Sequence, residues 1–430
     1  MSLLHDIPPD KPVGQLPPQP WLRSAAANML FAALTAEGDS ARFVGGCVRD
    51  GLAGRPVRDL DISTTALPEH VMRLLRSHNI RALPTGLDHG TVTAVIGEQR
   101  FEVTTLRTDV ACDGRRARVV FTEDWLDDAT RRDFTINAMS CDQDGRIYDP
   151  FDGISDLSAG HIRFIGEAKK RVEEDVLRIL RFFRFYAHYG RPPVSADALS
   201  AIRVAAEHLD ELSGERMYEE TAKLLMGSDP AGVLLLMQSV RVLDYLLPEA
   251  KHFGRLRQLC FLESRGVVRD DVTPDAERRL AALLDPDGVG DVCDRFRLSR
   301  EQRRRLRQIC EPAVPVTPDM SDADLMRLCQ DGGQDSARDI LLLGWSEIRT
   351  TDPRGAAADT KLWCRRLDKI RHWEPKEFPL QGRDLQALGI GPGPQMGALL
   401  AAAEHWWEEE GFTPDRTALL NFVRKRLKGR

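Results

Sequence analysis

The sequence predicts an α+β protein with a mixed sheet and helices at the N-terminal end and a long all-α region after it. Short runs of β-type composition alternate with helical stretches up to about residue 153. Nearly everything from 168 to 430 has a helical pattern that is interrupted by proline and glycine. The change falls at the segment DPFDG, residues 149–153.

The expected elements follow in chain order. A helix is expected at 22–36, where alanine and leucine dominate, and further helical stretches at 47–53 and 68–78. β-type runs are expected between and after them, at 41–46, 59–64, 91–97, 100–107 and 136–142.

Bulk composition limits the class of protein. The chain has 430 residues, 42% hydrophobic residues and a net charge of −6, which excludes a mostly disordered chain. The charge speaks against indiscriminate coating of nucleic acid, but it does not exclude RNA as a partner. We find no apolar run of about 20 residues, so we expect no membrane. The eight cysteines form no CxxC pair, which predicts reduced thiols and a cytoplasmic protein.

A glycine turn is the first candidate for chemistry. Residues 43–50 run from an expected strand through Gly45 and Gly46 into an expected helix. Paired glycines let backbone amides approach a phosphate closely, and Arg49 lies one turn into the helix, within reach of the same anion. These residues predict nucleotide binding, and the alternative is a plain strand-to-helix turn.

Acidic residues follow the glycine turn. Asp59 and Asp61 alternate with apolar residues, so on a strand their carboxylates share one face. Adjacent carboxylates repel each other unless a cation lies between them, and Mg²⁺ is the hard, phosphate-bridging candidate. The pair therefore predicts a two-metal site for phosphoryl transfer, and an edge strand with a solvated face is the alternative. Glu102 is a candidate third carboxylate, or else an outward-facing strand residue.

The segment RRDFTINAM, residues 131–139, is the second candidate. Arg132 can pair with a triphosphate through two hydrogen bonds, and Asp133 and Asn137 can hold ribose hydroxyls. The alternative is a surface cluster of salt bridges at the start of a strand.

A row of charged residues marks the third candidate, at 174–186. Asp175, Arg178, Arg181 and Arg184 are three apart in an otherwise apolar helix, which predicts that they line a cleft, with structural ion pairing as the alternative. An aspartate beside an arginine offers an acceptor next to donors, as the Watson–Crick edges of cytosine and adenine require. Uracil and guanine present the reverse order and would leave buried groups unpaired.

Several ordered motifs together resemble the class II tRNA nucleotidyltransferases, or CCA-adding enzymes, of the DNA polymerase beta-type superfamily, a family that includes bacterial poly(A) polymerases. The matching segments are FVGGCVRD (43–50), RDLDIST (58–64), EVTTLR (102–107), RRDFTINAM (131–139), YDPFDG (148–153), EEDVLRILRFFRF (173–185), SGERMYEETAKLL (213–225) and LQGRDLQALGIGPGPQMGALL (380–400).

The resemblance implies addition of C, C and A to tRNA 3′ ends from CTP and ATP. It implies that Gly46 and Arg49 contact the triphosphate, that Arg132 meets the nucleotide and that Asp59 and Asp61 hold Mg²⁺. It further implies that Asp175 and Arg178 recognise the base beside Arg181 and Arg184. We expect an arm at 1–22, a catalytic head at 23–153, a neck at 154–227, a body at 228–318 and a tRNA-binding tail at 319–430.

Three alternatives for the function stay open: a poly(A) polymerase, an enzyme that adds only CC or only A, and an inactive RNA-binding relative. The Asp59 and Asp61 pair argues against the last, because a non-catalytic module has no need of two crowded acids. We expect tRNA, CTP and ATP as partners and no DNA.

Two further regions bear on the substrate. Residues 107–120 are expected to form a loop with Arg115, Arg116 and Arg118. In the resembling family, a loop here helps the change from CTP to ATP, so shortening it should spare C addition and impair A addition. The basic runs at 295–307 and 424–430 are candidates for contact with the RNA backbone.

Overall fold

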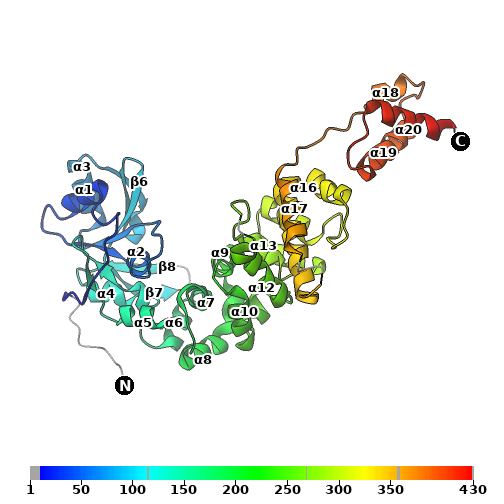
Figure 1. Cartoon of the computed structure of the whole chain (residues 1–430). Coiled ribbons are helices and arrows are strands. Elements are labelled where there is room, and N and C mark those ends of the chain that lie inside the picture. Colours follow the sequence, from blue (N-terminus) through cyan, green and yellow to red (C-terminus); the bar gives the residue numbers. More distant parts are fainter. Residues whose placement is uncertain (1–9, 114–115, 268, 356–358, 429–430) are drawn as a thin grey trace. The chain divides into compact units, whose positions relative to one another are not determined.

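The computed structural model describes residues 10–113, 116–267, 269–355 and 359–428 (Figure 1). The chain forms two compact units. The first contains the chain up to Leu212 together with Met237–Leu246, and the second contains Ser213–Leu236 together with the chain from Leu247 onward. The α+β class is confirmed, because every strand within the described ranges lies in the first unit and is followed by helices.

An eight-stranded sheet organises the first unit, with strand order β1-β10-β9-β2-β3-β6-β5-β4. The sheet is mixed, as predicted, since β3 and β6 are parallel and the other neighbours are antiparallel. Its strands are β1 (Gly14–Gln15), β2 (Ala41–Val44), β3 (Asp61–Thr64), β4 (Arg81–Gly86), β5 (Thr91–Ile96), β6 (Gln99–Thr105), β9 (Ser140–Cys141) and β10 (Arg146–Tyr148).

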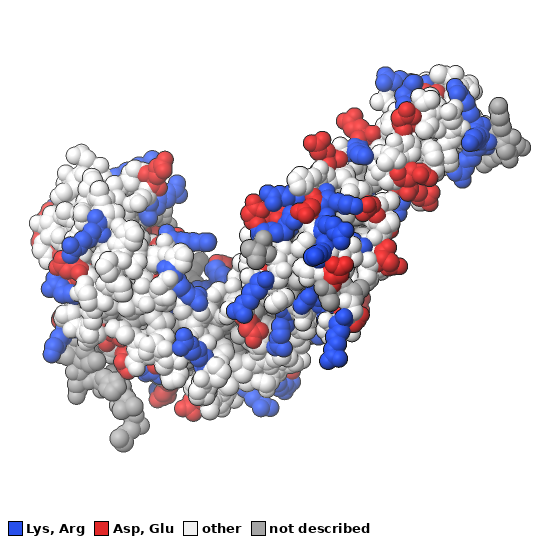
Figure 2. All heavy atoms as spheres, viewed as in Figure 1, with Lys and Arg blue, Asp and Glu red and all other residues white. Residues whose placement is uncertain are grey.

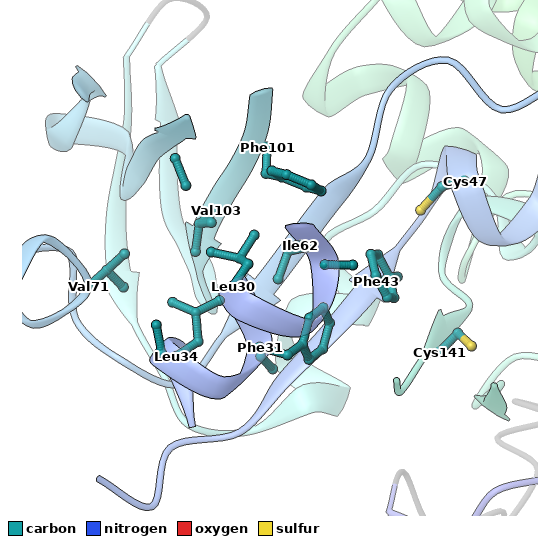
Figure 3. Close-up of a cluster of buried hydrophobic side chains, with 14 of the residues drawn as sticks. Leu30, Phe31, Leu34, Phe43, Cys47, Ile62, Val71, Phe101, Val103 and Cys141 are labelled. Atoms are coloured by element: carbon teal, nitrogen blue, oxygen red, sulfur yellow. The ribbon is translucent and has the colours of Figure 1, made fainter. Parts of the chain in front are cut away.

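The hydrophobic core of the head lies between this sheet and its helices. The helical elements here are α1 (Ala25–Leu34), α2 (Gly46–Leu52), α3 (Pro68–Ser77), η1 (Leu87–His89), α4 (Trp125–Thr130) and η2 (Thr135–Asn137). The core joins α1 to three strands through Leu30, Phe31, Leu34, Phe43, Ile62 and Val103 (Figure 3). Phe43 precedes the glycine turn and Ile62 follows Asp61, so burial of these two side chains fixes where both motifs lie.

Most expected head elements are present with shorter ends, but the expected strand at 136–142 is wrong in its first half. Residues 135–137 form the 3₁₀ turn η2, and only Ser140–Cys141 pair as a strand. The sequence did not predict three short or irregular strands, which are β1, β4 and β10. β1 and β10 are too short to show alternation, and β4 contains Pro84, which is tolerated there because β4 is an edge strand.

The expected loop at 107–120 is also wrong. β7 (Arg107–Asp113) and β8 (Arg116–Phe121) pair as a separate antiparallel hairpin, in which Arg107 is opposite Phe121. A two-stranded hairpin pairs its backbone locally, so it needs less hydrophobic alternation than a strand of a large sheet. Arg115 lies outside the described residues, and of Arg116 and Arg118 only the backbone is described.

Helices complete the first unit. They are α5 (Gly153–Ala159), α6 (Ala168–Glu174), α7 (Leu177–Tyr189), α8 (Ala196–Ala205), η3 (Ala206–Glu211) and α11 (Val242–Leu246). The single helix expected at 174–186 is wrong at its start, because Asp175 is extended (φ −153°, ψ 107°) and separates α6 from α7. The Asp175 carboxylate accepts a hydrogen bond from the Leu177 amide at 3.1 Å, a local bond that competes with helix continuation.

The second unit is helical and begins with α9 (Gly214–Leu225). α10 (Pro230–Ser239) runs across the border between the units. The others are α12 (Phe253–Phe261), η4 (Leu262–Gly266), α13 (Ala276–Ala281), η5 (Pro286–Gly288), α14 (Val289–Arg295), α15 (Arg300–Cys310), α16 (Asp322–Thr351), α17 (Thr360–Arg371), α18 (Gly382–Gln386), α19 (Pro394–Glu409) and α20 (Arg416–Lys428). α16 is kinked at Gly333, whose φ of 78° and ψ of 174° are not helical. None of the helices in the described part of the chain is long and apolar enough to cross a bilayer.

The expected borders at 22, 153, 227 and 318 stay predictions. Within the expected arm, Gly14–Gln15 pairs with β10, and Leu16 and Leu22 are buried in the core of the head.

Candidate active site

The glycine turn joins β2 to α2 at the edge of a cleft. Gly45 has φ 67° and ψ −116°, a backbone conformation that favours glycine. A Cβ at Gly45 would lie 3.1 Å from a guanidinium nitrogen of Arg132, so the absence of a side chain lets this arginine approach. The Gly45 amide donates to the Met139 carbonyl at 3.1 Å, so it is already occupied within the protein.

The three predicted carboxylates lie close together. Asp61 is the first residue of β3 and is paired in register with Glu102 on the parallel strand β6. We expected Asp59 on the strand, but it lies two residues before β3 begins. Burial raises the pKa of Asp61, the carboxylates of Glu102 and Asp59 raise it further, and Arg132 opposes them.

These acids fit a cation only in part. In the ranges that the structure describes, no cluster of three or more His, Cys, Asp or Glu residues could hold a metal ion alone. Asp61 is half-buried, whereas Asp59 and Glu102 are exposed. Burial is the main cause of the raised pKa of Asp61, and the two neighbouring carboxylates add to it, so a cation bound here would favour the ionised form. The donor set therefore suits Mg²⁺ that takes its remaining ligands from phosphate and water.

Asp128 on α4 orders the two arginines that follow this helix. Its carboxylate accepts hydrogen bonds from Arg131 at 2.8 Å and from Arg132 at 3.0 Å. Burial alone would raise the pKa of Asp128, but the guanidinium groups of Arg132 and Arg131 outweigh it and lower the pKa. Sequence reasoning missed Asp128 and Arg131, although spacings of three and four residues are a usable signal.

A buried hydrogen-bond network crosses behind the glycine turn. Arg49 donates to the side-chain oxygen of Asn137, whose amide donates to Asp133 at 2.9 Å. Asp133 also accepts from Arg181 on α7 at 2.6 Å. Burial would raise the pKa of Asp133, but Arg181 and the hydrogen bond from Asn137 lower it. Asp133 and Asn137, which we expected at the ribose, thus hold the arginines in place.

Arg49 has further partners that the sequence did not indicate. Its guanidinium donates to Asp50 at 2.9 Å and lies 5.0 Å and 4.7 Å from the ring centres of Phe185 and Tyr189. The Tyr189 hydroxyl donates to Asp50 as well. Aromatic side chains of α7 therefore pack around the cation of α2.

The row on α7 begins with Arg178. Arg178 donates to Glu174 and, at 2.8 Å, to the carbonyl of Arg171. Arg184 lies 4.6 Å from the ring centre of Phe185. Asp175 precedes the helix and stands beside its first turn.

One cleft of about 420 Å³ gathers these parts in the first unit. Its walls include every predicted nucleotide-binding residue and one of the predicted metal ligands. They are Gly45, Gly46, Arg49, Asp61, Arg131, Arg132, Asp133, Asn137, Asp175, Arg178, Arg181, Arg184 and Phe185. Asp59 and Glu102 are not among the lining residues. Three motifs that are spread along the sequence from Gly45 to Phe185 therefore form one site.

The arginine-rich run at 295–307 is partly neutralised. On the face shown in Figure 2, Lys and Arg side chains of the second unit are interspersed with Asp and Glu. Four arginines of the run form ion pairs, and these are Arg295, Arg297, Arg303 and Arg305. Arg300, Arg304 and Arg307 on α15 are exposed, share one helix face and have no ion-pair partner among the residues described.

Two family models match parts of this chain. A model of the poly A polymerase head domain matches residues 41–163, and a model of the probable RNA and SrmB-binding site of polymerase A matches residues 194–253.

Two relatives match over most of their length. CCA tRNA nucleotidyltransferase 1, mitochondrial, from Homo sapiens is 33% identical over 394 residues, covering 90% of this chain and 87% of that protein. A CCA-adding enzyme from Streptococcus sanguinis is 33% identical over 377 residues, covering 86% of this chain and 90% of the relative. The crystal structure of the Bacillus stearothermophilus CCA-adding enzyme in complex with CTP has a TM-score of 0.74 at 27% identity, covering 93% of this chain and 96% of that one.

Proposed function

The chain belongs to the family of CCA-adding tRNA nucleotidyltransferases and poly(A) polymerases, and on that premise we propose how its cleft works. The protein is a nucleotidyltransferase that adds C, C and A to tRNA 3′ ends from CTP and ATP and releases pyrophosphate. The observation that carries the proposal is the single cleft that holds Asp61, the glycine turn and the arginines of α7. A cleft that only bound RNA would have no need of a half-buried carboxylate with a raised pKa.

The arginines bind the triphosphate. Arg132 faces the glycine turn and is fixed by Asp128, so its charge is positioned before the nucleotide arrives. Arg181 is fixed by Asp133 in the same way. Prepositioned charges of this kind neutralise the phosphates without reorganisation as the tRNA 3′-hydroxyl attacks the α-phosphate in line.

Asp59 and Asp61 would hold Mg²⁺, and Glu102 is the third carboxylate of the group. Bound Mg²⁺ would supply charge neutralisation at the phosphates and a more acidic 3′-hydroxyl. The protein's own contribution is the register of Asp61 on β3 with Glu102 on β6, which keeps these two carboxylates close.

Base recognition is assigned to Asp175 and Arg178. Asp175 sits at the break before α7 and Arg178 lies in its first turn, and both line the cleft. An acceptor beside a donor matches cytosine and adenine, and the mismatch with uracil and guanine would leave buried polar groups without partners.

The tRNA backbone is expected to contact the exposed face of α15 formed by Arg300, Arg304 and Arg307. Each neutralised phosphate releases counterions, so the affinity for tRNA should fall steeply with salt. Replacing all three arginines by glutamine should weaken tRNA binding. It should also reduce the slope of log affinity against log salt concentration by the equivalent of about three phosphate contacts. The same replacement of Arg303 and Arg305, which are in ion pairs, should leave the salt dependence unchanged.

A cytoplasmic location is part of the proposal. Seven cysteines in the described residues are free thiols, which supports a reducing compartment. A fluorescent fusion that entered an organelle or an envelope fraction would overturn this assignment.

The test of the activity uses tRNA that lacks its terminal nucleotides, together with labelled CTP and ATP. Sequencing of the products should show ordered C, C and A followed by termination. A long A tract would establish a poly(A) polymerase instead, and addition of CC or A alone would establish the narrower enzymes. Asp59→Ala should abolish addition with the fold retained. Glu98→Gln removes an exposed head carboxylate away from the cleft and should have no effect.

A further inference from the structure

Arg171 is a side chain behind the cleft that contacts two parts of its wall. It lies on α6, and neither Arg171 nor its neighbour Glu174 is among the residues that line the cleft. The Arg171 side chain is only 11% exposed. A buried guanidinium requires several acceptors, so its partners show what it is positioned to hold.

The first partners are backbone carbonyls at the end of α4. One terminal nitrogen of Arg171 donates to the carbonyl of Arg131 at 2.8 Å and also to the carbonyl of Arg132. Arg131 is the C-cap of α4, where carbonyls carry partial negative charge and a cation is favourable. Asp128 holds the side chains of the same two residues, so their backbone and their guanidinium groups are both fixed.

The second partner connects Arg171 to α7. Its other terminal nitrogen donates to a Glu174 carboxylate oxygen at 2.6 Å. The same oxygen accepts a hydrogen bond from Arg178, which also donates to the backbone carbonyl of Arg171 at 2.8 Å. Arg171 therefore orients the Glu174 carboxylate, and this carboxylate in turn orients Arg178.

We propose that Arg171 is a positioning residue that sets where Arg131 and Arg132 stand relative to Arg178. The inference rests on the proposed function, in which Arg132 meets the phosphates and Arg178 meets the base, and Arg131 lines the same cleft. A nucleotide has a fixed length from triphosphate to base, so both ends bind well only if these arginines are correctly spaced. Loss of Arg171 should weaken nucleotide binding and relax base choice together.

A substitution at Glu174 separates the effect on base choice from the effect on nucleotide binding. It connects Arg171 with Arg178 only, so Glu174→Gln should affect base choice and leave nucleotide affinity nearly unchanged. Lys170 is the matched control, because it is a cation on the same helix whose partner, Glu167, is also exposed. Lys170→Met should change neither property.

The experiment uses the full-length protein and compares Arg171→Met, Arg171→Lys, Glu174→Gln and Lys170→Met. Calorimetric titration gives Kd for CTP and for ATP, and single-turnover reactions on the shortened tRNA compare incorporation of C with that of U. For Arg171→Met, we expect Kd for both nucleotides and the U-to-C ratio to rise about tenfold, the change expected for loss of one charged hydrogen bond. Glu174→Gln should raise the U-to-C ratio and keep Kd within about twofold of wild type.

Arg171→Lys keeps the charge but lacks the planar fork that serves two partners at once. It should restore thermal stability without restoring Kd or base choice, which distinguishes positioning from a purely structural role. The proposal is overturned if Arg171→Lys restores thermal stability, Kd and base choice together. It is also overturned if Arg171→Met lowers stability and leaves Kd and base choice intact. Failure of the wild-type protein to add C, C and A would overturn the proposed function instead, and Kd for ATP and CTP would still decide the role of Arg171.

Discussion

Single carboxylates show how closely charge is controlled in the head. Asp61 and Asp128 are both sheltered from solvent, yet their pKa values move in opposite directions. Asp61 has two carboxylates near it and one opposing arginine, whereas Asp128 is held between two arginines. The first arrangement attracts a cation, and the second keeps cations in place for an anionic substrate.

Asp61→Asn should abolish addition and stabilise the metal-free protein. A raised pKa means that folded protein holds the Asp61 proton more tightly than unfolded protein does, so stability falls as the pH rises from 3.8 through the folded-state pKa. At neutral pH, the neutral asparagine should therefore raise the melting temperature by about 2–4 °C per kcal/mol gained. The gain should shrink on acidification toward pH 4.

Scanning calorimetry with and without Mg²⁺ checks this prediction. Mg²⁺ should stabilise the wild-type protein and not Asp61→Asn, because only a ligand that binds the folded state shifts the transition. An equal response of the two proteins would exclude Asp61 as a metal ligand.

Asp128→Asn should cost about 3 kcal/mol of unfolding free energy, because two guanidinium groups lose a buried carboxylate. The pKa of Asp128 is lowered, so its contribution is present above pH 3.8 and is lost as the pH falls through the folded-state pKa. The neighbouring exposed Asp127 is the control, and Asp127→Asn should change stability by less than about 0.5 kcal/mol. Urea denaturation at pH 7 measures both, and equal losses would contradict the role of Asp128.

Sequence patterns predicted the residues that line the cleft better than the residues that hold them in place. Arg178 and Arg181 stand out because charge interrupts an apolar stretch, and Arg132 stands out as part of the motif at 131–139. Arg171 does not stand out, because its carbonyl partners at Arg131 and Arg132 are 40 and 39 residues away and backbone acceptors have no sequence signal.

Among the elements, predictions failed where a local hydrogen bond competed with periodicity. The three-residue spacing from Asp175 to Arg184 continues without interruption, but the Asp175 side chain bonds the Leu177 amide and the helix starts anew. The β7–β8 hairpin was missed for the opposite reason, because its pairing is local and requires no apolar alternation. The large core strands and α1 were predicted well since burial imposes their pattern.

The kink of α16 depends on glycine. Gly333→Ala should cost about 2 kcal/mol, because φ 78° with ψ 174° is a region that only glycine adopts readily. No heavy atom lies within 4 Å of a Cβ built there, so the loss is conformational rather than steric. Gly397 in α19 has equal space and no positive φ, so Gly397→Ala should stabilise by up to about 1 kcal/mol. Opposite signs in urea denaturation would confirm this account, and a stabilised Gly333→Ala would refute it.

At the scale of the whole molecule, the two units are stabilised differently. The first has a hydrophobic sheet core, and its Arg181–Asp133 ion pair lines the cleft, whereas the second contains an ionic network that is fully buried. Arg278 donates to Glu263 at 2.8 Å and to Asp339 at 2.7 Å, and both carboxylates are buried. Arg279 extends the network from Glu263 to the Leu225 carbonyl at the end of α9.

Arg278→Met should lower the stability of the second unit by about 3 kcal/mol, because each of two buried carboxylates loses one of its two guanidinium partners. Glu263 keeps Arg279, and Asp339 keeps Arg305. Hydrogen–deuterium exchange should accelerate in 213–236 and 247–430 and stay unchanged in the head. Arg257→Met, at an exposed position on α12, should have no effect on exchange. Faster exchange in the head would show that the units do not unfold separately.

The division of the chain has a consequence for its synthesis on the ribosome. The first unit includes Met237–Leu246, and α11 from this segment packs against η3. The catalytic half therefore cannot finish folding when residue 212 leaves the exit tunnel, and must wait until 24 residues of its neighbour and the returning segment have been translated. A chain truncated at 212 would retain every residue of the cleft and still lack the helix that completes its unit.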